Sequence, residues 1–187
     1  MNYLNVYSST IADGPGVRVS IYVSGCHFHC RGCHNPESWN FEAGQDFTDE
    51  TLEQLMNYCN HDYIQGLSIL GGEPLSEANR SIVANIVYEF THRFPKKDLW
   101  IWTGYEYQDL LEEMKAKSTN PFKKAFYELF TILDSVDVLV TGQFLIDQRD
   151  ITKNNLYRGS KNQRVIDVKK SREAGKTIYL EGIPNNS

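Results

Sequence analysis

The stretch VRVSIYVSGCHFHCRGCHN, residues 17 to 35, joins a strand pattern directly to a cluster of cysteines. Its first seven residues alternate apolar and polar side chains and include several β-branched ones, which predicts a strand over Val17 to Val23. Cys26, Cys30 and Cys33 follow within eight positions. The cysteines are therefore expected in a loop at the carboxyl end of a strand.

Further strand patterns alternate with helical patterns along the chain. Strands are predicted at 66–74, which ends in GGEP, at 98–104 and at 136–140, with shorter candidates at 164–168 and 177–182. Helices are predicted at 77–90, 107–116 and 120–133, and after the N-cap Thr48, where Cys59 falls on the buried stripe. Segment 141–163 is polar and loop-like, Met1 to Ala12 is uninformative, and the tail from about residue 182 is expected to fray.

This alternation predicts an α/β fold with a parallel sheet and right-handed crossovers. A chain of 187 residues can bury one core, and we expect a single domain over residues 1–187. A closed eight-unit barrel typically needs about 250 residues, so an open or partial βα barrel fits the length better. Functional loops gather at the carboxyl ends of such strands, where both the cysteines and GGEP lie.

Composition excludes several classes of function. The chain has 19 Lys and Arg against 24 Asp and Glu, and its basic pairs are scattered, which argues against a nucleic-acid partner. No secretory leader is recognisable, and no run approaches the roughly 18 apolar residues of a membrane span, so we expect a cytoplasmic protein without a membrane partner. Three crowded cysteines among four indicate metal or redox chemistry instead of a disulfide framework.

Two kinds of metal centre fit the cysteine loop. Zinc would take three thiolates and one of His27, His29 or His34 as its fourth ligand. Three thiolates on a cubic iron–sulfur cluster would instead leave one iron open for chemistry. Zinc sites commonly draw their ligands from two separated pairs, whereas all of these ligands lie in one short loop. Spacing alone favours the cluster and leaves zinc as an alternative.

The spacing C-x3-C-x2-C, followed one strand later by GGEP, resembles the radical S-adenosylmethionine superfamily. This resemblance implies a [4Fe-4S] cluster whose open iron binds the amino and carboxylate groups of S-adenosyl-L-methionine. The reduced cluster would cleave the sulfonium to a 5'-deoxyadenosyl radical, because the cofactor carries the difficult step while the protein aligns it. The resemblance also implies an open, partial βα barrel of the radical S-adenosylmethionine type.

A longer match narrows the resemblance. DGPGVRVSIYVSGCHFHCRGCHNPESW (13–39), LSILGGEPL, IWTGY, VDVLVTGQF and YRGSKNQRVID are similar to glycyl-radical-enzyme activating proteins, most closely the branch that acts on anaerobic ribonucleoside-triphosphate reductase. This implies an enzyme that places a glycyl radical on the reductase's large catalytic subunit and receives electrons from a flavodoxin or a ferredoxin. The alternatives are activation of another glycyl radical enzyme, such as pyruvate formate-lyase, or a non-catalytic zinc-binding interaction module.

The resemblance also implies roles for single residues. Cys26, Cys30 and Cys33 would ligate the cluster, and Gly32 and His34 would line the cofactor. Gly71 and Gly72 would let the backbone approach the S-adenosylmethionine amino group, while Glu73 supports the loop and Pro74 fixes the turn. Asp13 and Arg18 would face the partner's glycyl loop, although a purely structural turn at DGPG is the alternative.

Two positions depart from the pattern of the superfamily. Gly32 stands where many members carry an aromatic residue beside the adenine, which would leave the adenine to the backbone and to neighbouring side chains. Thr141 stands where this branch would carry an acidic residue, and the role of that position is open. His27 and His29 are interpreted as loop residues, and the aromatic residues Trp100, Trp102, Tyr105 and Tyr107 as core and rim.

Overall fold

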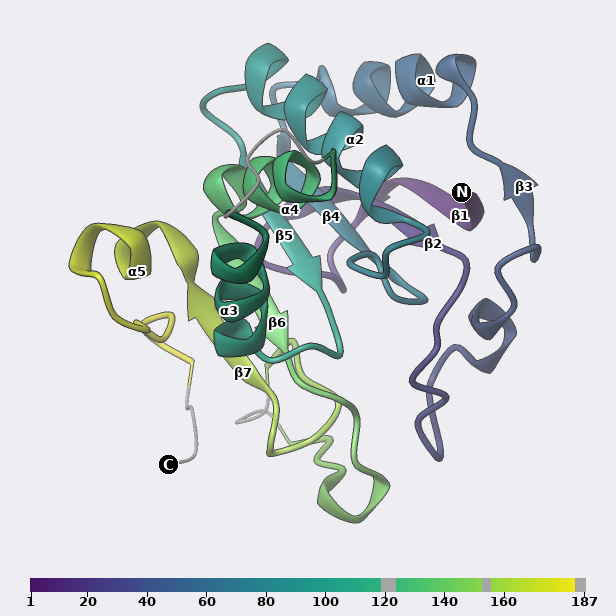
Figure 1. The fold of residues 1–187 in the computed structure, drawn as a ribbon. Coiled ribbons are helices and arrows are strands. Elements are labelled where there is room, and N and C mark those ends of the chain that lie inside the picture. The colour runs from purple at the N-terminus through teal and green to yellow at the C-terminus, as the bar shows by residue number, and fades with distance from the viewer. Residues whose placement is uncertain (119–123, 153–155, 184–187) are drawn as a thin grey trace.

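The computed structural model describes residues 1–118, 124–152 and 156–183 (Figure 1). In this part of the chain one sheet of seven strands runs in the order β3-β1-β2-β4-β5-β6-β7 and does not close on itself. The strands are β1 (Asn2–Thr10), β2 (Val17–Val23), β3 (Gln45–Asp46), β4 (Ile64–Gly71), β5 (Asp98–Trp102), β6 (Val138–Thr141) and β7 (Arg164–Asp167). The prediction of an open α/β fold is confirmed.

Parallel pairing is confined to the centre of the sheet. Strands β2, β4, β5 and β6 are parallel neighbours, whereas β1 and β3 at one edge and β7 at the other pair antiparallel. The expectation of a parallel sheet is therefore wrong at both edges. The turn from β1 to β2 spans only residues 11–16, too few for the crossover that a parallel pair requires.

Four helices cover one face of the sheet: α1 (Asp49–Cys59), α2 (Arg80–Arg93), α3 (Tyr107–Ser118) and α4 (Lys124–Ser135). Alternate residues of the strands pack against them, beginning with Val19, Ile21 and Val23 of β2, all fully buried. The intervening residues of β2, Arg18 and Tyr22 among them, belong to the opposite face, which is open in the sense that none of these helices covers it. A second buried cluster lies on this face, formed by Trp100, Val138, Val140 and Val165. That open face and the carboxyl ends of the parallel strands position the candidate site.

Most predicted elements are found, with boundaries shifted by a few residues. Thr48 caps α1 as predicted. Its hydroxyl accepts the backbone N–H of Thr51, and the Thr51 hydroxyl accepts the backbone N–H of Thr48. The predicted helix at 120–133 begins outside the described residues and is α4 from Lys124 onward. No helix in the described ranges is long and apolar enough to cross a membrane.

Three elements differ from the sequence prediction. The stretch judged uninformative contains β1, which lies between the short edge strand β3 and β2 and whose residues are half-buried or exposed. The candidate strand at 177–182 is reduced to a single bridge between Tyr179 and Ile166. Helix α5 (Val168–Ala174), which no pattern predicted, follows β7 and ends at Gly175 in the left-handed conformation.

Candidate functional site

Loops from four parallel strands enclose a cavity of about 140 Å³ at their carboxyl ends. The cysteine loop follows β2, the GGEP loop follows β4, Thr103 and Gly104 follow β5, and Gly142 to Phe144 follow β6. Residues of all four loops line the cavity, including the three clustered cysteines, Gly71, Gly72 and Glu73. The fold thus brings together the two sequence motifs that were predicted to carry the chemistry.

The three cysteines of the loop are free thiols in this structure. Cys26 is buried, and Cys30 and Cys33 are half-buried. Burial raises the pKa of the Cys26 thiol, and hydrogen bonds from the backbone N–H groups of Phe28 and His29 lower it by less. Burial also raises the pKa of the Cys30 thiol. Because the thiolate is the reactive form, the raised pKa values make these two thiols weaker free nucleophiles.

Cys59 lies in a different environment. It is fully buried in the core on α1, and burial raises the pKa of its thiol to about 12. This agrees with its interpretation as a small core residue.

The histidines between the cysteines contact aromatic rings. His29 stacks on Trp39 with ring centroids 4.7 Å apart, and His27 contacts Phe28 at 4.2 Å. His34 lies 5.2 Å from the ring of Phe144. Their contacts therefore favour the interpretation of His27 and His29 as loop residues that pack the site's surroundings.

The GGEP loop lies directly against the cysteine loop. Gly72 donates its N–H to the carbonyl of Val23 (2.8 Å), and Glu73 donates its N–H to the carbonyl of Gly25 (2.7 Å). A Cβ on Gly72 would meet the Gly25 carbonyl oxygen at 2.5 Å, so a side chain there would force the two loops apart. Gly72 is thus required for the close approach of the two loops.

Glu73 joins the GGEP loop to the loop after β5. Its buried carboxylate accepts hydrogen bonds from the Leu75 N–H, the Thr103 hydroxyl and the Gly104 N–H, at 2.7 to 2.8 Å. Burial raises its pKa to about 7, and the three donors act in the opposite direction. Glu73 therefore holds the GGEP loop and the loop after β5 together in the cavity wall, because all three of its hydrogen bonds are to groups of the protein.

A second cavity, of about 370 Å³, adjoins the first on the open face of the sheet. The two share Cys33, Gly71, Trp102, Phe144 and Gln163 as lining residues. The second is further lined by Asp13, Tyr22, His34 and Arg158. A ligand that touches the cysteine loop can thus extend along the sheet toward Asp13.

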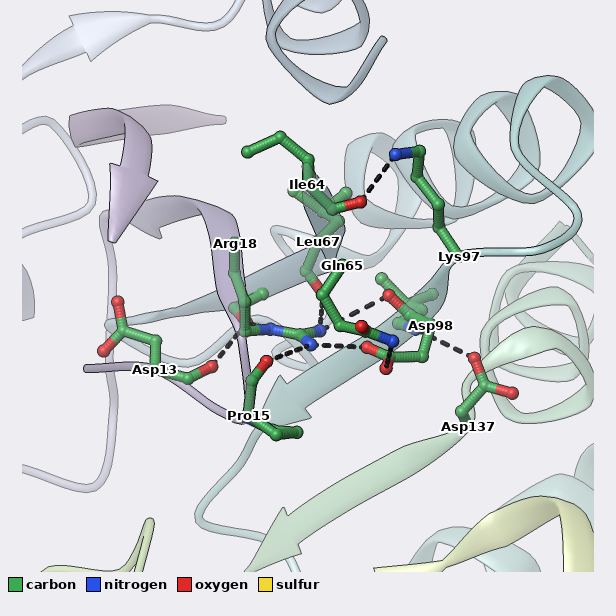
Figure 2. A network of polar contacts seen from close by, with 11 residues as sticks. Asp13, Pro15, Arg18, Ile64, Gln65, Leu67, Lys97, Asp98 and Asp137 are labelled. Atoms are coloured by element: carbon green, nitrogen blue, oxygen red, sulfur yellow. Dashed lines mark hydrogen bonds and ion pairs between the residues drawn. The ribbon is translucent and has the colours of Figure 1, made fainter. Parts of the chain in front are cut away.

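Asp13 and Arg18, the two residues predicted to face a partner, have different surroundings. The Asp13 carboxylate accepts the Tyr22 hydroxyl at 3.1 Å and lines the second cavity. Arg18 is fully buried, its guanidinium donates to the Ser68 hydroxyl at 2.8 Å, and it pairs with Asp98, as Figure 2 shows for Asp98. Because Ser68 donates to the Asp13 carbonyl, Arg18 can act on a ligand only through the turn that it supports.

Sequence reasoning missed several residues of the site. Phe144 and Gln163 come from the segment that was predicted only as a polar loop. Thr103 follows the β5 pattern and carries no metal- or nucleophile-type group, and Trp102 was interpreted as core or rim. The only available signal was that IWTGY, VDVLVTGQF and YRGSKNQRVID belong to the resemblance.

The donor set fits an iron–sulfur cluster. Three thiols from one loop line one cavity and can each bind a different iron. Among the described residues, no three His, Cys, Asp or Glu side chains converge as ligands of a single metal ion. A structural zinc site would need such convergence of four ligands, whereas a cluster spreads its thiolates over several irons.

Comparison with known proteins agrees with this donor set. Residues 12–166 match the family model described as a 4Fe-4S single cluster domain. The chain is 36% identical over 88% of its length, and 93% of the relative's, to an anaerobic ribonucleoside-triphosphate reductase-activating protein of Enterobacteria phage T4. It is 38% identical to the protein of that name from Pasteurella multocida, over 87% of this chain and 95% of the relative. For the Escherichia coli K12 protein of that name the identity is 36%, over 88% of this chain and 97% of the relative.

Proposed function

The chain belongs to the family of anaerobic ribonucleoside-triphosphate reductase-activating proteins with a 4Fe-4S single cluster domain, and on this premise we propose that it is the activase of such a reductase. Its partner would be the large catalytic subunit of the reductase, on which it generates a glycyl radical. One observation carries the proposal: three thiols of one loop and the GGEP backbone line the same cavity.

In this proposal Cys26, Cys30 and Cys33 hold a [4Fe-4S] cluster, and S-adenosyl-L-methionine occupies the adjoining cavities. When bound and reduced, the cluster supplies the electron that cleaves S-adenosylmethionine to a 5'-deoxyadenosyl radical, which takes a hydrogen atom from a glycine of the partner. The electron donor would be a flavodoxin or a ferredoxin.

The residues of the chain bind and orient these groups. Gly71 and Gly72 would present backbone to the methionine end of the cofactor, and Gly32 and His34 would line it beside the third cysteine. Glu73 and Pro74 would fix the GGEP loop, for which the carboxylate's three hydrogen bonds are the physical support. Asp13, which lines the second cavity, would face the glycyl loop of the partner, with Arg18 holding its turn.

An open, partial barrel of the radical S-adenosylmethionine type suits a protein substrate. Helices α1 to α4 cover only one face of the described sheet (Figure 1). The second cavity is lined by residues of the other face, such as Tyr22. A loop of a large partner can enter from that side, whereas a closed barrel would admit small molecules more readily.

The test is anaerobic reconstitution with iron and sulfide, followed by electron paramagnetic resonance with and without S-adenosylmethionine. We expect a reduced-cluster spectrum that changes when S-adenosylmethionine is added, and 5'-deoxyadenosine as a product. Cys30→Ala should abolish the cluster, whereas the matched Cys59→Ala should keep it and cost only stability. A spectrum that ignores S-adenosylmethionine, or equal cluster loss in both variants, would overturn the proposal.

The partner is identified in a second assay. Purified large subunits of anaerobic ribonucleotide reductase and of pyruvate formate-lyase are each incubated with the reduced protein and S-adenosylmethionine. A glycyl radical signal on the reductase alone is expected, and a signal on the lyase alone would assign the chain to the other activases.

A further inference from the structure

The segment that follows β6 lies against the cysteine loop, although the two are far apart in the sequence. Ile146 packs on Gly32, and the ring of Phe144 lies 5.2 Å from that of His34. Phe144 lines the first cavity together with the cysteines, and both Phe144 and Ile146 line a third hollow that also includes Cys30. Residues 142–148 thus touch the cysteine loop from two sides.

Gly32 makes this contact possible. Its φ is +76°, and a Cβ there would come within 2.8 Å of the Cδ1 atom of Ile146. A larger residue at position 32 would therefore displace Ile146 or distort the turn between Cys30 and Cys33. Ile146, which follows β6, thus occupies the space that a side chain at position 32 would fill.

Residues 142–145 are held by hydrogen bonds with the stretch SKNQ, residues 160 to 163. The buried Ser160 hydroxyl accepts the Leu145 N–H at 3.2 Å. The side-chain amides of Asn162 and Gln163 donate to the carbonyls of Gln143 and Gly142, both at 2.8 Å. These bonds fix the backbone of 142–145 and so hold the segment against the cysteine loop.

We propose that residues 142–148 form a clasp that positions the turn carrying Cys30 and Cys33, with Ile146 and Phe144 as positioning residues. The inference rests on the proposed iron–sulfur function of these cysteines and adds to it the element that holds them in place. The clasp also restricts access of solvent and oxidants to Cys30 from the outside.

The outermost contact of the clasp contributes little. Arg31 and Asp147 form an ion pair at 3.0 Å, but their side chains are 79% and 86% exposed. Water screens such a pair, so the clasp depends on the packing of Ile146 and Phe144.

The clasp can be tested on thiol reactivity, without any activity assay. The full-length, reduced, metal-free chain is treated with iodoacetamide, and the alkylation rate of each cysteine is followed by mass spectrometry. The variants are Ile146→Ala, the volume-conserving Ile146→Leu, and the matched control Ile151→Ala, whose isoleucine is 86% exposed. The same variants are then reconstituted, and the loss of the cluster's visible absorption in air is timed.

We expect Ile146→Ala to raise the alkylation rates of Cys30 and Cys33 severalfold and to shorten the lifetime of the cluster in air by a similar factor. Cys59 should keep its slow rate, and Ile146→Leu and Ile151→Ala should behave as the unmodified chain. If Cys30 and Cys33 each react at the same rate in all four proteins, the clasp is overturned. A parallel rise in the rate of Cys59 in Ile146→Ala would also overturn it, because that would show loss of the whole fold. If the unmodified chain assembles no cluster, the proposed function fails while the alkylation rates still decide the clasp.

Discussion

Arg18 and Asp98 pair across an intervening strand, with 2.5 Å between a guanidinium nitrogen and a carboxylate oxygen (Figure 2). Arg18 lies on β2 and Asp98 on β5, and both are in register with Gly66 of β4 between them. A Cβ on Gly66 would come within 2.8 Å of the Arg18 guanidinium, so the glycine leaves the path across β4 clear. Three adjacent strands of the sheet are thereby tied by one buried cation.

Arg18→Met should destabilise the protein by about 3 kcal/mol, because breaking a buried pair leaves the other charge without compensation. The loss falls at the low end for such pairs, since the Asp98 side chain keeps 27% exposure. The measurement is urea unfolding of the metal-free chain. Arg31→Met removes the arginine of the exposed pair with Asp147 and should leave the unfolding midpoint almost unchanged. Equal losses in the two variants would show that burial does not set the strength of the Arg18 pair.

The central strands and most of the helices were predictable because local patterns determine them. Val17–Val23 has the bounds that its alternation predicted, and Thr48 caps α1 as its residue type indicated. Strand β1 was harder to predict, since its residues are half-buried or exposed and it lacks a clear apolar face. Strand direction at the β7 edge depends on a long connection whose path no local pattern describes.

The candidate site was predictable where its chemistry lies in short motifs. Three crowded cysteines and GGEP are visible in the sequence, and the structure lines one cavity with both. The clasp was not predictable, because the contact of Ile146 with Gly32 depends on tertiary folding and involves no titratable group. Burial of Arg18 was likewise hidden, since nothing local distinguishes an arginine that crosses a sheet from one that faces a partner.

Glu73 should make stability depend on pH. Its pKa is raised by burial from 4.5 to about 7, so the folded chain binds more protons than the unfolded chain between these values. The contribution of Glu73 to the free energy of unfolding should therefore be fully present below pH 4.5 and lost as the pH rises to about 7. Glu73→Gln should remove this dependence, which denaturation of both metal-free proteins at pH 5 and 7.5 would measure. An identical difference between the two pH values in both proteins would mean that Glu73 is ionised throughout.

Gly72→Ala should separate the GGEP loop from the cysteine loop, because the new Cβ would meet the Gly25 carbonyl oxygen at 2.5 Å. Crowding of this kind typically costs about 1 to 3 kcal/mol. We expect assembled cluster but a weakened response of its electron paramagnetic resonance spectrum to S-adenosylmethionine. The matched control is Gly175→Ala after α5, where a Cβ would meet nothing within 4 Å but the left-handed backbone (φ +64°) makes alanine cost stability away from the site. A normal spectral response in Gly72→Ala would show that the spacing of the two loops is unimportant for the cofactor.

Asp13→Asn should impair transfer to the partner while leaving the cofactor chemistry intact. The buried Asp13 carboxylate accepts the Tyr22 hydroxyl at 3.1 Å and lines the second cavity, so the substitution removes a negative charge from the wall of that cavity. Loss of one hydrogen bond to a charged group is worth about 1.5 to 3 kcal/mol, which corresponds to a roughly 10- to 100-fold lower rate of glycyl radical formation. The radical is counted by electron paramagnetic resonance on the large subunit, and 5'-deoxyadenosine is measured in parallel without the partner. Asp46→Asn, which changes an exposed aspartate on β3, serves as the control. A parallel fall in both readouts would place Asp13 at the cofactor, and no fall in either would leave the turn with a structural role only.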